Sequence, residues 1–194
     1  ATLESEMEAA SAGGVTSLAC PPDTDPPLDE PGLVEMLKFR AKNLNQARVY
    51  PVGALTEGLK GARLTEMAEL VDAGCIAFSQ ADAPFTDNQV LYHALLYAAT
   101  FGFPVWLRAQ DSALARDGVA HDGQVATRLG LPGIPVCAET VALSTILILA
   151  RETGARVHLA RLSSAEGVDR VRQAKRLGLP VTCDIAIHHA HLTE

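Results

Sequence analysis

Aromatic residues are scarce in this chain: Phe, Trp and Tyr make up 5% of its 194 residues, whereas 48% are hydrophobic. Aliphatic side chains must therefore fill the one sizeable core that a chain of this length can bury. Long hydrophobic runs are also lacking. The longest, residues 141–150, contains Ser144 and Thr145, and it is too short to span a bilayer. The sequence therefore predicts a globular protein without a membrane partner.

Runs of positive charge are absent as well, and the net charge is −7 with a pI of about 5.3. This composition excludes nucleic acid and anionic membrane surfaces as expected partners. The opening residues ATLESEMEAA contain acids and no apolar signal segment. The cysteines are far apart and form no C-x-x-C pair: Cys20, Cys75, Cys137 and Cys183. They predict reduced core thiols in a cytoplasmic protein.

Short apolar runs alternate with longer amphipathic segments along the chain. The predicted strands are residues 15–20, 48–55, 75–79, 104–110, 156–162 and 180–187. The predicted helices are residues 4–12, 31–46, 64–73, 88–100, 138–153 and 165–177. Gly74 and Gly154 stand where a helix ends in a left-handed residue, and Ser163 or Ser164 can cap the last helix. These signals predict six strand–helix units.

The predicted strands are nearly continuous apolar runs, which is typical of a parallel sheet covered on both faces. Such a repeat forms either an open doubly wound sheet or a (β/α)8 barrel. No glycine-rich phosphate motif follows a strand, and polar residues stand at the strand ends, so the barrel is favoured. A complete barrel needs about 250 residues. We therefore predict an α/β fold, a TIM-type barrel of about six βα units that lacks its first and last strands, with residues 1–194 as a single domain.

Four collinear segments point to one family. They are AGGVTSLACPPDTDPPLD (12–29), GALTEGLKGARLTEMAELVDAGCIAFS (53–79), ATRLGLPGIPVCAETVAL (126–143) and the stretch from ARVHLARLSSAEG (155–167) to the end. Together they resemble the dihydroorotase family of the amidohydrolase superfamily. The resemblance covers essentially the whole chain. It implies the central portion of an amidohydrolase barrel, with the family's H-x-H strand before residue 1 and its catalytic aspartate after residue 194.

The resemblance also implies a zinc site, because the family uses zinc to activate water and polarise the carbonyl. Three ligand positions inside this chain are altered. The family's F-[ST]-D-D-G reads FSQAD here, which places Gln80 at the first aspartate, and no lysine between Lys60 and Lys175 could be carboxylated. V-H-C-E-D reads LRAQD, and H-[IL]-x-H reads HLAR, so that Arg108 and Arg161 replace histidines. A guanidinium has no lone pair with which to bind zinc.

The substrate side is altered too. Asp23 stands where the family's M-P-N-T asparagine donates to the substrate carboxylate, and an anion there repels an anionic ligand. We therefore predict no catalytic, cofactor-binding or metal-binding residues and no cofactor. We expect Arg108 and Arg161 to occupy the vacant metal positions and to pair with acids such as Asp82 or Asp111. The alternative is that both are ordinary surface arginines.

Two histidine features need separate interpretation. His189 and His191 form an H-x-H, and the period of two would place both on one face of a strand, where they could hold a metal. A ligand pair is the less favoured interpretation, because the family pattern contains H-H-L without using it as a ligand pair. His158 alternates with Arg161 along its strand. It is therefore predicted to face the helix layer as a hydrogen-bonded core residue.

These residues predict a non-catalytic dihydroorotase-like protein. The resemblance implies its role, a structural and assembly partner of the aspartate transcarbamoylase catalytic chain in pyrimidine biosynthesis, in a homo- or hetero-oligomer. Two alternatives stay open. One is an active zinc-dependent dihydroorotase, a cyclic amidohydrolase that converts carbamoyl aspartate to dihydroorotate. The other is a small-anion-binding barrel, in which Arg108 and Arg161 hold a carboxylate or phosphate in bidentate fashion.

Overall fold

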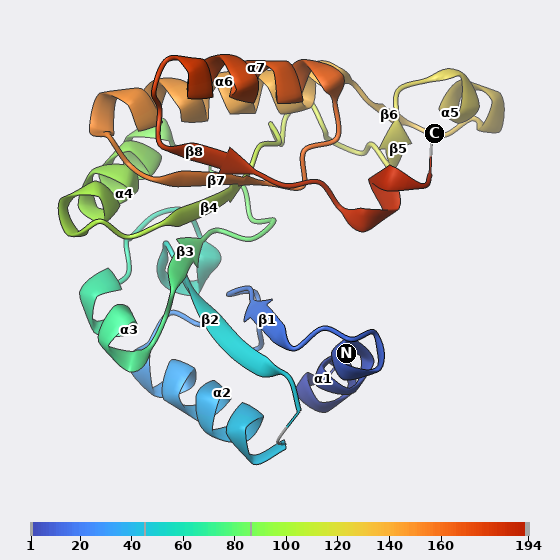
Figure 1. Cartoon of the computed structure of the whole chain (residues 1–194). Coiled ribbons are helices and arrows are strands. Elements are labelled where there is room, and N and C mark those ends of the chain that lie inside the picture. Colours follow the sequence, from blue (N-terminus) through green and yellow to red (C-terminus); the bar gives the residue numbers. More distant parts are fainter. Residues whose placement is uncertain (1, 45, 86, 193–194) are drawn as a thin grey trace. The chain divides into compact units, whose positions relative to one another are not determined.

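The structure is a computed structural model, and it describes residues 2–44, 46–85 and 87–192 (Figure 1). The chain divides into two compact units. Unit 1 comprises Ala1–Ala94 with Phe103–Val105, and unit 2 comprises Leu95–Gly102 with Trp106–Glu194. Within the described ranges, no helix is both long enough and apolar enough to cross a membrane.

Unit 1 is built on three parallel strands in the order β1-β2-β3. The strands are β1 (Ser17–Cys20), β2 (Arg48–Ala54) and β3 (Ala77–Ser79), with Ser17 opposite Arg48 and Val52 opposite Ala77. The helices are α1 (Leu3–Ala12), α2 (Pro31–Leu44) and α3 (Met67–Ala73), with a short 3-10 helix, η1 (Glu57–Leu59). The core is largely aliphatic, as the composition predicts; its fully buried members include Met7, Val34, Val52, Leu55, Met67, Leu70 and Phe78.

Close packing in unit 1 depends on a glycine in the central strand. An ideal Cβ on Gly53 would lie 2.9 Å from the ring of Phe78 and 3.2 Å from the sulfur of Cys75. Real Cβ atoms essentially never come within 3.0 Å of another heavy atom, so the approach to Phe78 excludes a side chain here. The aromatic ring of β3 can therefore lie against β2 only because this position carries no side chain.

Unit 2 contains the strands β4, β7 and β8, which are neighbours in that order. They are β4 (Val105–Arg108), whose first residue belongs to unit 1, β7 (Val157–Ala160) and β8 (Val181–Cys183), and β7 pairs in parallel with β8. Two helices, α6 (Val136–Thr153) and α7 (Ala165–Arg176), lie side by side along the β7–β8 pair (Figure 1). The helix α4 (Asn88–Phe101) runs from unit 1 into unit 2.

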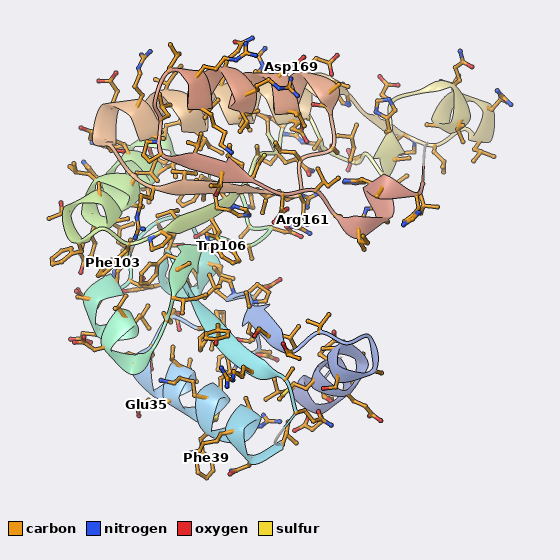
Figure 2. All side chains as sticks on the ribbon, in the orientation of Figure 1. Glu35, Phe39, Phe103, Trp106, Arg161 and Asp169 are labelled. Carbon is orange, nitrogen blue, oxygen red and sulfur yellow. The ribbon has the colours of Figure 1, made fainter. Side chains whose placement is uncertain are left out.

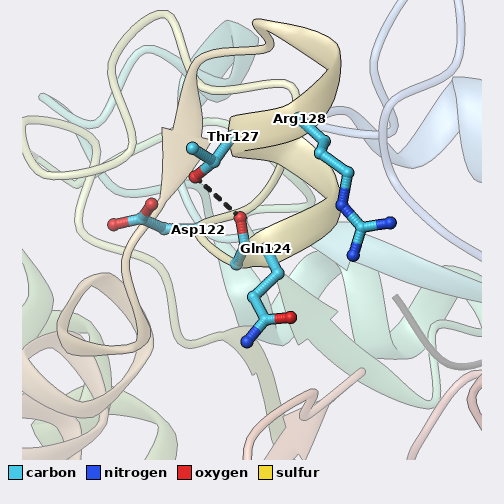
Figure 3. Close-up of a pocket in the computed structure, with 5 residues that line it drawn as sticks. Asp122, Gln124, Thr127 and Arg128 are labelled. Carbon is cyan, nitrogen blue, oxygen red and sulfur yellow. Dashed lines mark hydrogen bonds between the residues drawn. The ribbon is translucent and has the colours of Figure 1, made fainter.

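A small substructure fills the connection between β4 and α6. It consists of β5 (Ala120–His121), α5 (Gln124–Leu129) and β6 (Gly133–Ile134), with β5 and β6 in parallel. A hollow beside α5 is lined by Asp122, Gln124, Thr127 and Arg128, and the Thr127 hydroxyl donates to the Gly123 carbonyl at 3.0 Å (Figure 3). These elements were not predicted, because two-residue strands and a six-residue helix are too short to show a period.

Every predicted strand and helix has an observed counterpart, but all six of these strands are shorter than predicted, the last one most clearly. The strand expected at 180–187 ends at Cys183, and residues Ile187–Ala190 form a 3-10 helix, η2. Gly74 and Gly154 end their helices in the left-handed region, and Ser164 caps α7, as predicted. The prediction of a single domain over residues 1–194 is not tested by the two units and stays a prediction.

The cysteine prediction holds in part. All four cysteines are free. Cys75 is buried, and this burial raises the pKa of its thiol to about 12. Cys137, however, is exposed near the start of α6, so the expectation that all four belong to the core is wrong for this residue. The residue type of Cys137, at the second position of α6, does not by itself indicate whether the side chain will face the core or the solvent.

Candidate functional site

Gln80, at the end of β3, is a buried amide with both of its ends engaged. Its side chain is 2% exposed. Its Oε1 accepts from the Thr56 hydroxyl at 3.0 Å, and its Nε2 donates to the Leu59 carbonyl at 2.9 Å. The Thr56 hydroxyl accepts in turn from the N–H of Gly61 at 2.9 Å. The amide therefore ties β3 to the turn that follows β2 within unit 1.

Asp23 lies in the loop after β1, where its side chain is exposed. Asp23 and Gln80 belong to unit 1, whereas Arg108 and Arg161 belong to unit 2. The prediction that Asp23 occupies the position of a substrate-binding asparagine is not tested by its exposure and stays a prediction.

Arg108 and Arg161 line one cavity of about 890 Å³ in unit 2. Arg108 is the last residue of β4, and Arg161 follows the last residue of β7; Figure 2 labels Arg161 at this strand end. The cavity's other polar lining residues are Gln110, His121, Glu139, Ser163, Ser164, Glu166, His188 and His189. The structure thus brings the two predicted arginines together around one space, whereas their pairing with Asp82 or Asp111 stays a prediction.

The backbone of Arg161 adopts a left-handed conformation, with φ of 57°. Such a conformation is unusual for a residue with a side chain and costs about 1–3 kcal/mol. A network of hydrogen bonds holds it: the N–H of Arg161 donates to Asp184 Oδ1 at 2.6 Å, and Asp184 Oδ2 lies 2.9 Å from His158 Nε2. The other ring nitrogen of His158 lies 2.8 Å from the Thr182 hydroxyl. Asp184, which follows the last residue of β8, therefore fixes the backbone conformation of Arg161, which follows the last residue of β7.

His158 is hydrogen-bonded, as predicted, but it does not belong to the fully buried face of its strand. Val157 and Leu159 occupy that face and are 2% and 0% exposed. His158 is half-buried on the opposite face, with its ring centroid 5.1 Å from that of Trp106. The prediction that it faces the helix layer is wrong, because the left-handed turn at Arg161 breaks the alternation on which that prediction relied.

Asp184 is ionised more readily than an ordinary aspartate. Burial by itself would raise its pKa. The hydrogen bonds from the Arg161 N–H and from His158, together with the charges of His158 and Arg161, lower it further than burial raises it. The pKa of Asp184 therefore lies below its usual value, and the carboxylate is available to hold both partners.

Glu139 is a buried carboxylate that sequence reasoning did not single out. It is 9% exposed and accepts four hydrogen bonds, from the N–H and hydroxyl of Ser163 at 2.7 and 2.8 Å and from those of Ser164 at 3.1 and 2.5 Å. Ser164 also accepts from the N–H of Gly167 at 2.9 Å, as the cap of α7. The carboxylate thus lies at the positive end of that helix. The segment ATRLGLPGIPVCAETVAL (126–143), which resembles the family and contains this glutamate, is the signal that could have found it.

The H-x-H of His189 and His191 is not on a strand. His188 and His189 belong to η2, with ring centroids 4.3 Å apart, and both line the cavity, whereas the lining does not include His191. The prediction that a strand places His189 and His191 on one face is therefore wrong, because period two does not apply to a 3-10 helix. Among the described residues, no three His, Cys, Asp or Glu side chains are grouped so that they could hold a metal ion.

Comparison with known proteins decides the family. The family model of dihydro-orotase-like proteins matches residues 1–167. This chain belongs to that family. It is 49% identical over 192 residues to a dihydroorotase-like protein of Pseudomonas aeruginosa, and 41% identical over 192 residues to a dihydroorotase of Syntrophotalea carbinolica. Each alignment covers 99% of this chain and 45% of the relative, so the chain spans less than half the length of these relatives.

Solved structures agree on the fold. An L-hydantoinase (dihydropyrimidinase) from Arthrobacter aurescens matches 95% of this chain and 42% of its own length with a TM-score of 0.76 at 21% identity. A dihydroorotase from Campylobacter jejuni matches 98% of this chain and 51% of its own length with a TM-score of 0.66 at 14% identity. These are amidohydrolase TIM barrels, and the predicted fold class, a partial barrel of about six βα units, is confirmed.

The zinc that the family implies does not fit the donor set found here. The family pattern predicts that Arg108 and Arg161 replace two of its ligand histidines, and guanidinium nitrogens offer no lone pair. It predicts Gln80 at a third ligand position, and there the amide oxygen already accepts from Thr56 and the nitrogen donates to Leu59. A neutral, engaged amide is a poor substitute for a bridging carboxylate. We therefore derive no chemical step through a metal at these residues.

Proposed function

We propose that this chain is part of a dihydroorotase-like protein of pyrimidine biosynthesis that does not catalyse the dihydroorotase reaction. One observation carries the proposal: Arg108 and Arg161 line the same cavity, at the ends of β4 and β7. Both side chains are permanently charged. For a guanidinium and a divalent cation about 5 Å apart, an effective dielectric constant of about 20 gives a repulsion of about 7 kcal/mol.

The relatives give this proposal further support. The two that share 49% and 47% identity with this chain, from Pseudomonas aeruginosa and Pseudomonas putida, are called dihydroorotase-like proteins. Relatives at 41% and 42% identity are called dihydroorotases.

The proposed role is structural: the protein assembles with the aspartate transcarbamoylase catalytic chain and supports its activity. This partner follows from the family resemblance. A barrel that folds without a catalytic metal is suited to such a role. Contact with a partner uses the outer surface of the barrel, which does not require the zinc ligands at the strand ends.

The test uses the full-length protein that contains this chain. We expect zinc well below one ion per chain, no interconversion of carbamoyl aspartate and dihydroorotate, and co-purification with the transcarbamoylase, whose activity falls when this protein is left out. About one zinc per chain, the stoichiometry of a mononuclear catalytic site, with turnover that a chelator removes would overturn the non-catalytic proposal. A transcarbamoylase that is fully active alone would overturn the structural role.

The second candidate is an active zinc-dependent dihydroorotase, or another cyclic amidohydrolase. The observation that favours it is the 41% identity to a dihydroorotase over 99% of this chain. In that case the ligands would have to come from residues other than Gln80, Arg108 and Arg161. The zinc and turnover measurements described above discriminate between the two candidates directly.

A further inference from the structure

We infer that the cavity of unit 2 binds a small organic anion, whose carboxylate or phosphate group is held by Arg108 and Arg161. The inference goes beyond the proposed function and does not depend on it. Whether the cavity binds an anion is a separate question from whether the protein catalyses the dihydroorotase reaction or assembles with a transcarbamoylase. Four features of the described residues support it: the size of the cavity, its two kinds of wall, its cations, and the way in which Arg161 is fixed.

The size and walls of the cavity suit an organic molecule. Its volume of about 890 Å³ falls within the range of about 300–1,000 Å³ that is usual for small-molecule sites. A bare phosphate ion would fill only a small part of this space. Beside its polar residues, the cavity has an apolar wall formed by Ala109, Val119, Ile134, Pro135, Val136 and Leu192. Such a wall can cover the carbon skeleton of a ligand while the arginines hold its charged group.

The cations of the cavity come from neighbouring strands. Arg108 stands at the end of β4 and Arg161 follows the last residue of β7, and neighbouring strands of a sheet lie about 4.8 Å apart. Each guanidinium presents five N–H donors in a planar fork that matches a carboxylate or phosphate. A guanidinium can therefore keep a protein contact and still bind an anion. The imidazoles of His188 and His189 add further hydrogen-bonding nitrogens to the same cavity.

The two acids in the lining do not cancel these cations. Glu139 directs its carboxylate to the N–H and hydroxyl groups of Ser163 and Ser164. Its negative charge is therefore already satisfied by four donors and by the start of α7. Glu166 lies in the first turn of α7 and is exposed, as are Arg108 and Arg161. One exposed carboxylate of the lining therefore faces two exposed guanidinium groups, and the balance stays positive.

The backbone of Arg161 is fixed before any ligand arrives. Its left-handed backbone is held by the hydrogen bond to Asp184, and Asp184 is held by His158. A side chain whose starting direction is set in this way loses less entropy on binding than one on a mobile loop. Asp184 is accordingly a positioning residue for this site: it acts through Arg161.

The experiment is isothermal titration calorimetry on the full-length protein, with succinate, glycerol 3-phosphate and inorganic phosphate as separate probes. We expect succinate or glycerol 3-phosphate to bind at one site per chain with a Kd below about 1 mM, within the usual range for metabolites. The two organic probes show whether a carboxylate or a phosphate is preferred. Inorganic phosphate should bind more weakly than the better of them, because it cannot use the apolar wall.

Three variants test the assignment of residues. Arg108→Gln and Arg161→Gln should each weaken binding at least about tenfold, the loss expected from one charge-assisted hydrogen bond. Arg170→Gln, a matched change at an exposed arginine of α7 outside the cavity, should leave Kd unchanged. Circular dichroism of each variant shows whether it is folded.

Failure of this inference can be told apart from failure of the proposed function. If none of the probes binds, or if the folded Arg108→Gln and Arg161→Gln variants bind as tightly as the unaltered protein, no anion site exists here. Equal affinity for inorganic phosphate and for the organic probes would overturn the inference that the cavity selects an organic anion. Zinc content and turnover, measured on the same preparation, test the proposed function separately.

Discussion

Replacing Gly167 with alanine should destabilise this protein, although alanine is the better helix former. Gly167 is the third residue of α7, and an ideal Cβ there would lie 2.2 Å from Glu139 Oε1 and 3.0 Å from the Ser164 hydroxyl oxygen. The carboxylate cannot simply move aside, because it accepts four hydrogen bonds from Ser163 and Ser164. Either the helix start or the carboxylate must shift.

The magnitude follows from two opposing terms. Alanine in place of glycine within a helix stabilises by about 0.5–1 kcal/mol. Crowding at a packed site costs about 1–3 kcal/mol. If Glu139 is displaced instead, the N–H groups of Ser163 and Ser164 lose their acceptor, at about 1–3 kcal/mol each. The unfavourable term exceeds the favourable one in both cases, and we expect a net loss of about 2 kcal/mol in the free energy of unfolding.

Urea unfolding of the full-length protein, followed by circular dichroism, measures this loss as a lower midpoint. Gly32→Ala is the matched control, because Gly32 lies in the first turn of α2 and a Cβ there would have no heavy atom within 4 Å. That variant should be neutral or slightly stabilised.

A double variant tests the cause. In a Glu139→Ala background, Gly167→Ala should cost much less, because the carboxylate at 2.2 Å is gone and only the 3.0 Å approach to the Ser164 hydroxyl oxygen remains. The coupling between the two changes should be about 2 kcal/mol. The reasoning is refuted if Gly167→Ala behaves like Gly32→Ala, or if its cost is the same with and without Glu139.

Three further predictions follow from contacts in the two units. Gln80→Leu keeps the size of the side chain but removes the hydrogen bonds to Thr56 and Leu59. The free energy of unfolding should fall by about 1–3 kcal/mol, measured as a lower urea midpoint. An unchanged midpoint would contradict the structural role of the amide. The pKa of Asp184 is lowered in the folded state. The carboxylate therefore stabilises the folded protein at pH values above about 3.9, the usual pKa of an aspartate. This stabilisation is lost as the pH falls through the pKa of the folded state. The unaltered protein should therefore exceed Asp184→Asn in stability at pH 6, and the difference should shrink on acidification below about pH 4; a difference that is constant with pH would refute the assignment. Gly74→Ala introduces a side chain at φ of 117°, outside the left-handed region open to alanine, and its Cβ would displace Lys38 Nζ from its 2.8 Å hydrogen bond to the Ala73 carbonyl. It should lower the melting temperature more than Gly154→Ala, whose φ of 72° is close to that region and whose Cβ would have no atom within 4 Å. Equal losses would contradict this ranking.

The positions of the elements could be predicted because their signals are local. The glycine at the end of α3 and the serine before α7 are each read from a few neighbouring residues, and the structure confirms both. β5, α5 and β6 could not be predicted in the same way, since a strand of two residues has no period to detect. The prediction of a strand over 180–187 was wrong beyond Cys183: apolar residues resume at Ile185 after the charged Asp184, but the backbone leaves the strand there and forms η2 from Ile187.

The candidate site shows the same division between local and distant information. The side-chain chemistry of Arg108 and Arg161 is evident from the sequence, as is their position after apolar strands. The role of Glu139 is not, because its partners Ser163 and Ser164 lie 24 and 25 residues further along the chain. Contacts between residues so far apart leave no periodic pattern in a single sequence.

The amino-acid sequence is enough to name the groups that we predict at three zinc-ligand positions of the family pattern: two guanidinium groups and one amide. A guanidinium offers no lone pair wherever it lies, because this is a property of the side chain. The folded structure, in contrast, sets how these groups are used. It placed Arg108 and Arg161 on one cavity, fixed the left-handed backbone of Arg161 through Asp184, and enclosed the Gln80 amide between two partners. Burial and hydrogen bonding between distant segments arise only when the strands have paired and the helices have packed.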